Sequence, residues 1–263
     1  MDFEAFLRLV EEATGIKPEG ARLKRLKKLY EEKGKELVKS LEKASINGSL
    51  WQEVIEAVSV QETYFYRDGE VFECLRVHII PELLKLLKER EVRVWSAGCA
   101  TGEETYTLAM LFYETAKEKG IKEKMLEDRL LIIGTDISER ALKIAEEGVY
   151  KVSPMGSLRK APPFLMEYFE PHGKEIRVKD KVRRLVRFYL HNLLSGSPPL
   201  SPADLILCRN VLIYFSETAK QKAYDTFVSS LRKGGFLVLG ALDEPNRGLE
   251  KRSCGKVIYF VKP

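Results

Sequence analysis

The sequence has little of several features that mark particular protein classes. Its four cysteines show no C-x-x-C spacing: Cys74, Cys99, Cys208 and Cys254. With only 3 histidines in 263 residues, this pattern argues against a metal site and against a disulfide framework. We predict reduced, mostly buried thiols and no metal.

Long apolar runs are also absent. No stretch approaches the roughly 20 residues that span a bilayer, and acidic residues interrupt the apolar pattern of the first 15 residues, unlike in a secretory leader. We expect a cytoplasmic protein without membrane insertion. The formal net charge of +5 is modest, and the basic residues form no extended patch with interleaved aromatics, so nucleic-acid binding is not indicated.

The hydrophobic content of 44% is sufficient for a sizeable core, in one large domain or in a large and a small one. No long apolar face is left unexplained, and we expect a monomer. Residues 1 to about 58 read as short helices with no strand pattern between them, at 2–14, 19–34, 36–44 and 49–59. The second of these carries a basic stripe opposite its apolar arc, formed by Lys24, Arg25, Lys27 and Lys28.

A helix predicted at 69–89 leads into an alternation of apolar strands and amphipathic helices. The strands are expected at 92–98, 130–136, 185–191, 204–210 and 236–242, and the helices at 103–119, 138–149 and 216–233. Near-continuous apolar strands separated by helices predict a doubly wound α/β domain with a parallel sheet. The last run, 256–263, follows without room for a helix and is expected to return antiparallel at or near the sheet edge. Residues 151–187 break the alternation and predict a small antiparallel hairpin.

The first strand ends in a glycine turn. Gly98 and Gly102 have the spacing G-x-x-x-G, which lacks one glycine of the dinucleotide pattern G-x-G-x-x-G. Glu103 and Glu104 follow at the start of a helix, where a diphosphate would meet negative charge. A ligand with a positive charge and no phosphate fits this turn better.

The second strand ends at Asp136, where an acid typically accepts hydrogen bonds from ribose hydroxyls. An adenosine held there, beside the acids of the glycine turn, suggests S-adenosylmethionine. The alternative is that Asp136 caps the helix 138–149. Farther on, Arg209 and Asn210 interrupt an apolar run and indicate a functional loop at a strand end. Asn210 is a candidate for bonding the cofactor, and Tyr214 either reaches the reacting centre or is a core aromatic.

Five stretches, taken together and in order, resemble the motifs of the chemotaxis receptor methyltransferases, the CheR-type enzymes. They are "QETYFYR", "VWSAGCATGEETYTLAM", "GTDIS", "HNLL" and "CRNVLIYF". The resemblance implies a small all-α amino-terminal domain with a connector at 1–66 and a Rossmann-like class I methyltransferase domain at 67–263. It also implies a small β-subdomain inserted in the latter at about 165–188.

The implied activity is transfer of a methyl group from S-adenosylmethionine to glutamate carboxylates on cytoplasmic helices of chemotaxis receptors, leaving S-adenosylhomocysteine. The implied cofactor-binding residues are Gln61, Thr63, Arg67, Gly98, Glu103 or Glu104, Asp136, Asn192, Leu193, Asn210 and Val211. Family members often have asparagine where Gln61 stands, and "GALDEPN" replaces a "GHSE"-like ending, so that loop receives no role. The short turn "EPHGKE" favours receptor recognition without a carboxyl-terminal tether peptide.

The implied chemistry needs no general base, because a glutamate carboxylate is ionised at neutral pH. Arg67 is the candidate for orienting the substrate or cofactor carboxylate, with a surface ion pair to Asp68 or Glu70 as its alternative. Tyr214 would line the transfer site. The basic stripe either docks the acidic receptor helix or is a solvated face. The alternative functions are a methyltransferase for another protein or small molecule, and a cofactor-binding regulatory module.

Overall fold

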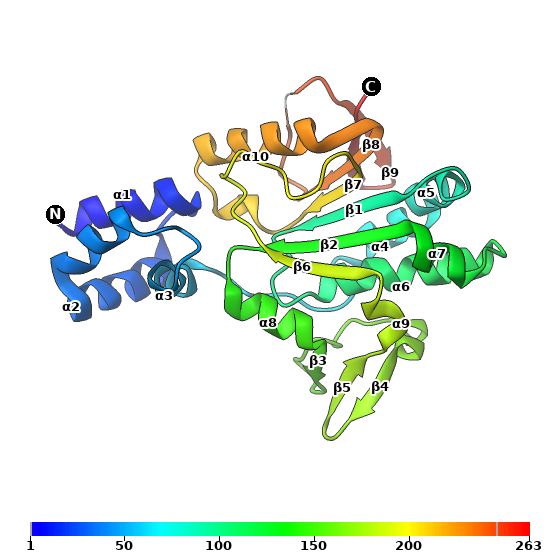
Figure 1. The fold of residues 1–263 in the computed structure, drawn as a ribbon, viewed down its shortest axis with the longest axis horizontal. Helices are drawn as coiled ribbons and strands as arrows, with labels where there is room; N and C mark the ends of the chain where they lie inside the picture. The colour runs from blue at the N-terminus through cyan, green and yellow to red at the C-terminus, as the bar shows by residue number, and fades with distance from the viewer. Residues whose placement is uncertain (1, 246) are drawn as a thin grey trace.

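The protein is described by a computed structural model that covers residues 2–245 and 247–263. Three helices, α1 (Phe3–Thr14), α2 (Gly20–Lys43) and α3 (Ser49–Val58), form a helical unit to one side of a larger sheet-containing body (Figure 1). Asp2 begins α1 by accepting a hydrogen bond from the backbone N–H of Ala5 at 2.9 Å. Helix α2 is interrupted at Gly34, whose φ of 69° and ψ of −164° are not helical, so the two predicted helices meet there.

A seven-stranded sheet forms the centre of the larger body. Its strand order is β6 (Val186–Leu190), β2 (Leu130–Asp136), β1 (Val92–Ala97), β7 (Ala203–Cys208), β8 (Leu231–Leu239), β10 (Val257–Val261) and β9 (Glu250–Cys254). The first five strands are parallel to one another, and β10 pairs antiparallel with both β8 and β9. The predicted doubly wound α/β architecture and the antiparallel return at 256–263 are confirmed. Strand β9 was not predicted.

Side chains alternate between the two faces of the sheet along each strand, and around β1 both faces are covered. Val92 and Val94 of β1 belong to a core shared with α6 (Glu103–Glu118). Trp95 and Ala97 belong to a second core, which joins α10 (Glu217–Ser230) to buried side chains of the helical unit. The helical unit and the sheet therefore share one continuous apolar core on that face.

The prediction of one continuous helix at 69–89 was wrong, because the segment is divided into three helical pieces. These are α4 (Gly69–Cys74), a π-helical turn (Leu75–Ile79) and α5 (Ile80–Leu86). Pro81 lacks the N–H that an α-helix would use at that point, and the wider turn precedes it. Helices α7 (Glu123–Arg129) and α8 (Glu139–Glu147) complete the larger body.

A small antiparallel sheet projects from the larger body, at the bottom of Figure 1. Its order is β3 (Val149–Lys151), β5 (Glu175–Val178) and β4 (Phe169–His172), and β4 and β5 form the predicted hairpin. The range 165–188 contains two of the three strands, since β3 lies before it. Two short helices flank the hairpin, η2 (Pro163–Tyr168) and α9 (Asp180–Arg183).

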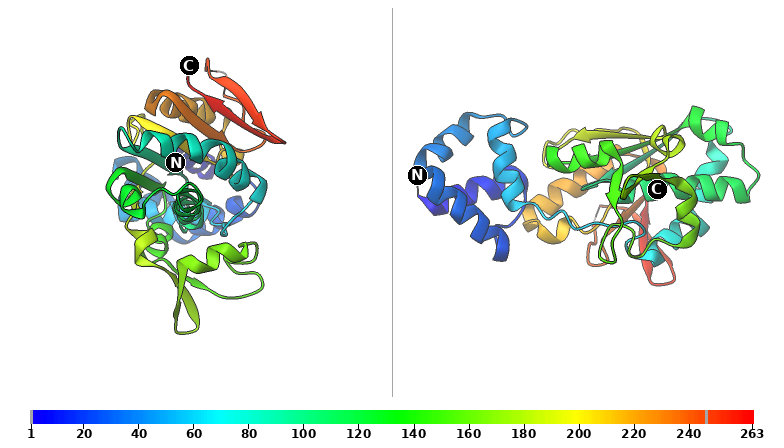
Figure 2. Two further views of the ribbon diagram at one scale, coloured as in Figure 1. Left: turned by 90° about the vertical axis from the view of Figure 1, so that its right-hand side faces the viewer. Right: turned by 90° about the horizontal axis from the view of Figure 1, so that it is seen from below.

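An extended connector, residues 59–68, runs from α3 to α4 between the helical unit and the sheet (Figure 2). All four cysteines are free thiols, and three of them are buried, as predicted. None of the helices within residues 2–245 and 247–263 has both the length and the apolar character to cross a membrane.

Candidate active site

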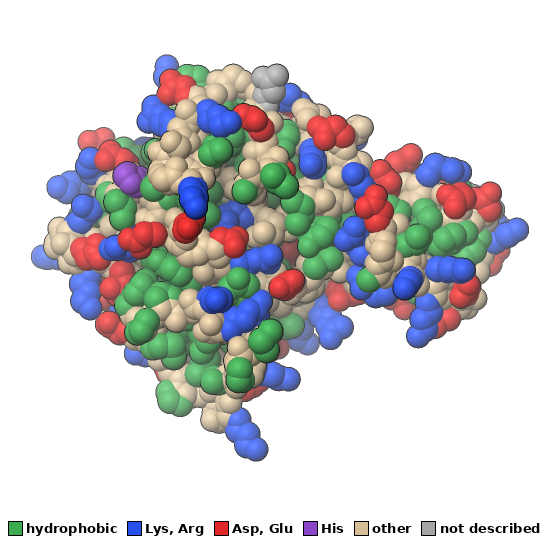
Figure 3. All heavy atoms as spheres, turned by 180° about the vertical axis from the view of Figure 1, so that it is seen from behind, with side chains coloured by type: hydrophobic (Ala, Val, Ile, Leu, Met, Phe, Trp, Pro, Cys, Tyr) green, Lys and Arg blue, Asp and Glu red, His purple; other side chains and the backbone are tan. Residues whose placement is uncertain are grey.

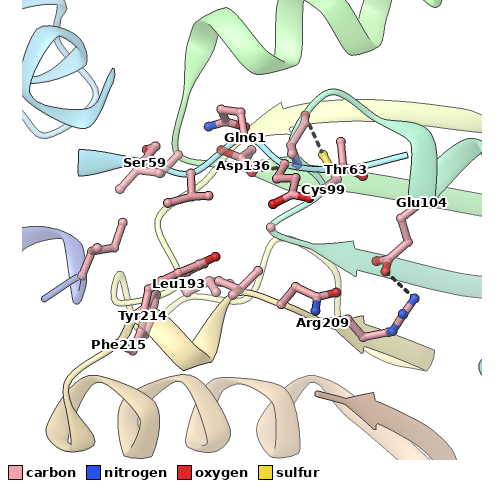
Figure 4. A pocket seen from close by; sticks show the side chains of 18 of the residues that line it. Ser59, Gln61, Thr63, Cys99, Glu104, Asp136, Leu193, Arg209, Tyr214 and Phe215 are labelled. Atoms are coloured by element: carbon pink, nitrogen blue, oxygen red, sulfur yellow. Dashed lines mark hydrogen bonds and ion pairs between the residues drawn. The ribbon is translucent and has the colours of Figure 1, made fainter. Parts of the chain in front are cut away.

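A cavity lies where the carboxyl ends of four neighbouring parallel strands meet the connector and the helical unit (Figure 4). Such an edge is where α/β sheets of this kind bind ligands. Every residue proposed above as catalytic or cofactor-binding lines this cavity, with the exception of Glu103. These residues are Gln61, Thr63, Arg67, Gly98, Glu104, Asp136, Asn192, Leu193, Asn210, Val211 and Tyr214.

The glycine turn folds back over the end of β2. The backbone N–H groups of Gly98 and Cys99 both donate to the carbonyl of Thr135, at 2.7 and 2.9 Å. Gly98 has a φ of 72°, and a Cβ placed on it would lie 2.4 Å from Cγ2 of Val211. Glycine is therefore required there both by the backbone conformation and by the close approach of the loop after β7.

Asp136 holds this turn in place. Its Oδ2 accepts a hydrogen bond from the N–H of Ala100 at 2.9 Å, and its Oδ1 accepts one from the N–H of Ser138 at 3.0 Å. Burial raises the pKa of Asp136, and these two backbone donors oppose that shift. The cap of α8 is Ser138, whose hydroxyl accepts from Ala141, so the capping alternative for Asp136 was wrong.

The two adjacent glutamates of α6 point in different directions. Glu104 lines the cavity, and its carboxylate accepts hydrogen bonds from the Ser96 hydroxyl at 2.9 Å and from Arg209 at 3.2 Å. Glu103 is buried outside the cavity, where the hydroxyls of Thr101 and Ser157 donate to it at 2.6 and 2.7 Å. Burial raises the pKa of both carboxyl groups. Of the two glutamates, Glu104 is therefore the one that lines the cavity.

Arg209 is a buried cation between two acids. Its guanidinium lies 2.6 Å from the carboxylate of Asp68 and 3.2 Å from that of Glu104, and its side chain is 3% exposed. Asp68 is thus paired with Arg209, and Arg67 forms no ion pair with any residue that the structure describes. The alternative of a surface ion pair for Arg67 was wrong. Its Nη1 instead donates to the carbonyl of Glu62, in the connector.

Tyr214 lies in a short 3₁₀ turn, η3 (Leu212–Tyr214), and is partly exposed where it lines the cavity. It also packs against the second core, but it is not fully buried there. Asn210, at the start of the same loop, has a left-handed φ of 59°. Asn192 uses its side chain within the protein, since its amide donates to the carbonyl of Ala13 at 2.7 Å and accepts from the N–H of Leu194 at 2.9 Å.

The lining residues missed at the sequence level include Thr14, Ile16, Phe72 and His191. Thr14 and Ile16 come from the helical unit and reach the cavity only because that unit packs on the sheet. His191 directly precedes Asn192, and its Nε2 lies 2.9 Å from the carbonyl oxygen of Ser197. The one sequence signal for His191 was its place as a polar residue directly after β6.

The basic stripe lies on α2, and all four of its side chains are exposed. Arg25 bonds the carbonyls of Ala57 and Ser59 at 2.7 and 3.3 Å, and so holds the end of α3. The Nζ atom of Lys27 lies 3.9 Å from the carboxylate of Glu31, and that of Lys28 lies 3.8 Å from the carboxylate of Glu32. Acidic and basic side chains are interspersed over the helical unit on the face in Figure 3.

Comparison with known proteins gives consistent matches. The family model described as "CheR methyltransferase, SAM binding domain" matches residues 61–254. The chain is 34% identical over 254 residues to Chemotaxis protein methyltransferase 1 of Pseudomonas aeruginosa, covering 93% of this chain and 90% of that protein. It is 33% identical over 255 residues to Chemotaxis protein methyltransferase Cher2 of Pseudomonas putida, covering 94% and 91%. The chemotaxis protein methyltransferase of Borreliella burgdorferi is 35% identical over 211 residues, covering 78% and 71%.

Proposed function

The chain belongs to the CheR methyltransferase family and is a methyltransferase that uses S-adenosylmethionine, and from this premise we propose that it methylates glutamate side chains of chemotaxis receptors. The product would be a glutamyl methyl ester. The observation that carries the proposal is that Arg67, Glu104, Asp136 and Tyr214 line one cavity.

The cavity fits the cofactor chemically. Asp136 is a buried acid, and the side chain of Glu104 is only 15% exposed. Arg209, a cation in the same lining, is already paired with Glu104 and Asp68. A sulfonium is more compatible with this charge than a diphosphate. The Oε1 atom of Gln61 is buried and has no hydrogen-bond partner among the described residues, so it is an acceptor suited to a ligand N–H or O–H.

Asp136 and the glycine turn would hold the adenosine end of the cofactor, and Glu104 its amino acid end. S-adenosylmethionine supplies an electrophilic methyl group when it is bound. The receptor carboxylate is ionised at neutral pH, with an ordinary pKa of about 4.3, so the enzyme is not required to remove a proton from it.

The side chains of the protein would then act by positioning and by excluding water. Arg67 carries the one guanidinium of the cavity without an acidic partner in the described chain, and it would orient the receptor carboxylate through a two-point contact. Tyr214 would border the path of the methyl group, and Thr14 and Ile16 would close the site from the helical unit. Positioning of reacting groups lowers barriers by about 7–11 kcal/mol in favourable cases.

The deciding experiment uses methyl-labelled cofactor, the full chain and cytoplasmic fragments of receptors, followed by mild alkali. We expect label on the receptor that is released as methanol, because carboxyl methyl esters hydrolyse under these conditions. Alkali-stable label, or label on another class of molecule, would contradict the proposed reaction. Cofactor binding without transfer to any receptor fragment would indicate a regulatory module instead.

A further inference from the structure

The segment that carries Tyr214 is bonded to the helical unit rather than standing alone. The N–H of Lys17 donates to the carbonyl of Tyr214 at 2.8 Å, and the N–H of Ser216 donates to the carbonyl of Gly15 at 2.9 Å. Ile16 and Phe215 form an isolated antiparallel bridge between these bonds. The link between α1 and α2 therefore supports the backbone of Tyr214 directly.

The aromatic ring of Tyr214 has a second contact with the same unit. The guanidinium carbon of Arg22, in the first turn of α2, lies 4.9 Å from the centre of the ring. This is within the separation of about 6 Å at which a cation is attracted to an aromatic face. Nε of Arg22 also donates to the carbonyl of Lys17 at 3.0 Å, which fixes the guanidinium over the ring.

The ring also packs, partly buried, against the second core, and two absences leave Arg22 as its one polar contact in the described chain. Within residues 2–245 and 247–263, the Tyr214 hydroxyl forms no hydrogen bond, and Arg22 forms no ion pair. The ring is thus not held through its hydroxyl, and no acid competes for the guanidinium. The turn η3 itself is anchored by Leu212 and Phe215, which are buried, so the backbone of Tyr214 is fixed and the guanidinium acts on the ring.

We infer that Arg22 is a positioning residue for the methyl transfer, acting through the ring of Tyr214. The inference rests on the proposed function, in which Tyr214 borders the transfer path. It adds a link from the helical unit to the reacting centre, since α2 carries Arg22 at its start and the basic stripe shortly after it.

The first test does not depend on the reaction. In the full chain with ¹³C-labelled tyrosine rings, the variant Tyr214→Phe identifies the Tyr214 signals among those of the 11 tyrosines. We expect Arg22→Met to shift the Tyr214 ring signals and to leave most others in place, whereas Lys35→Met, which removes an exposed charge from α2, leaves them all unchanged. Unmoved Tyr214 signals in Arg22→Met would overturn the inference, whether or not receptors are the substrate.

The second test separates positioning from docking by steady-state kinetics with receptor fragments. We expect Arg22→Met to lower kcat by about 3- to 30-fold, with the receptor KM and the cofactor Kd within twofold of wild type. Arg22→Lys retains a cation and should recover part of the loss. In a Tyr214→Leu background, Arg22→Met should not lower kcat any further, because the ring through which Arg22 acts is absent. A loss that persists in that background, or one that appears in KM alone, would contradict positioning through Tyr214.

Discussion

Arg209 and Glu104 form an ion pair of 3.2 Å at the wall of the cofactor cavity, with side chains that are 3% and 15% exposed. Burial raises the pKa of Glu104, and the guanidinium opposes this shift. A buried pair of this kind is sensitive to loss of one partner, because the charge left behind has neither water nor a counterion.

We expect Arg209→Met to destabilise the chain by about 3–5 kcal/mol, since Glu104 loses its buried counterion. Urea unfolding measures the change, and calorimetry should show weaker cofactor binding. The double variant Arg209→Met with Glu104→Gln should recover part of the stability. Lys251→Met, which breaks an exposed pair with Glu244, is the control and should change little. Equal effects of Arg209→Met and this control would show that the buried pair is unimportant.

Gly98→Ala tests the close approach of the loop after β7 to the glycine turn. The new Cβ would meet Val211 at 2.4 Å, so the loop or the turn must move, and we expect cofactor affinity to fall at least tenfold (~1.4 kcal/mol). Gly120→Ala is a matched control: its φ is also positive, at 65°, but no atom lies within 4 Å of the added Cβ. Both variants carry backbone strain, and only Gly98→Ala should weaken binding. Equal cofactor affinities of Gly98→Ala and Gly120→Ala would contradict a steric conflict between residue 98 and Val211.

Asp136→Ala removes the acceptor for the N–H groups of Ala100 and Ser138 and the proposed ribose acceptor. We expect a large loss of cofactor affinity by calorimetry and a stability loss of about 1–3 kcal/mol, because the backbone donors are left unpaired. Ser138→Ala is the useful comparison, since it removes the cap of α8 but leaves the carboxylate. It should lower stability by about 1 kcal/mol with little change in affinity. Unchanged affinity in Asp136→Ala would exclude it from the site.

Glu103 predicts a pH dependence of folding. Burial raises its pKa in the folded state above the usual 4.5, so the folded chain keeps this proton to higher pH than the unfolded chain. The contribution to stability is therefore full below 4.5 and is lost as pH rises through the raised value. We expect Glu103→Gln, which does not titrate, to gain stability relative to wild type as pH rises from 4.5 to 8. Urea unfolding across this range measures the difference, with the exposed Glu89→Gln as control. A difference that stays constant with pH would contradict the assignment.

Much of the cavity could be predicted because it lies at one edge of a parallel sheet. Gly98 directly follows β1 and Asp136 ends the neighbouring β2, and the strand pattern alone brings them together. Glu103 and Glu104 could not be separated from sequence, because the choice depends on Ser157, a loop residue more than fifty positions away that bonds Glu103.

The contributions of the helical unit were beyond sequence reasoning for a similar reason. Arg22 belongs to a helix whose apolar arc and basic stripe were recognised, but its contact with Tyr214 arises only from packing between distant segments. Strand β3 was missed because it has only 3 residues. Strand β9 (Glu250–Cys254) was missed because it is almost wholly exposed and lacks an apolar alternation.

The basic stripe of α2 yields a final prediction. Arg25 is unsuitable for testing receptor docking, because it bonds the end of α3 and its loss would disturb the connector. Lys24, Lys27 and Lys28 are exposed and can be changed together to glutamine. We expect the receptor KM to rise several-fold at low salt with kcat little changed, since exposed charges mainly steer the encounter with an acidic helix.

Measurements at increasing salt concentration test whether the effect of this triple variant is electrostatic. The increase in KM should shrink as ionic strength rises, because at about 0.15 M salt charges are screened over roughly 8 Å. A second triple variant, Lys88, Lys119 and Lys122 to glutamine, removes the same net charge from exposed positions outside the helical unit. If both triples raised KM equally, the effect would come from net charge, and the stripe would be a solvated face. If only the α2 triple did so, docking would be local to the helix that also carries Arg22.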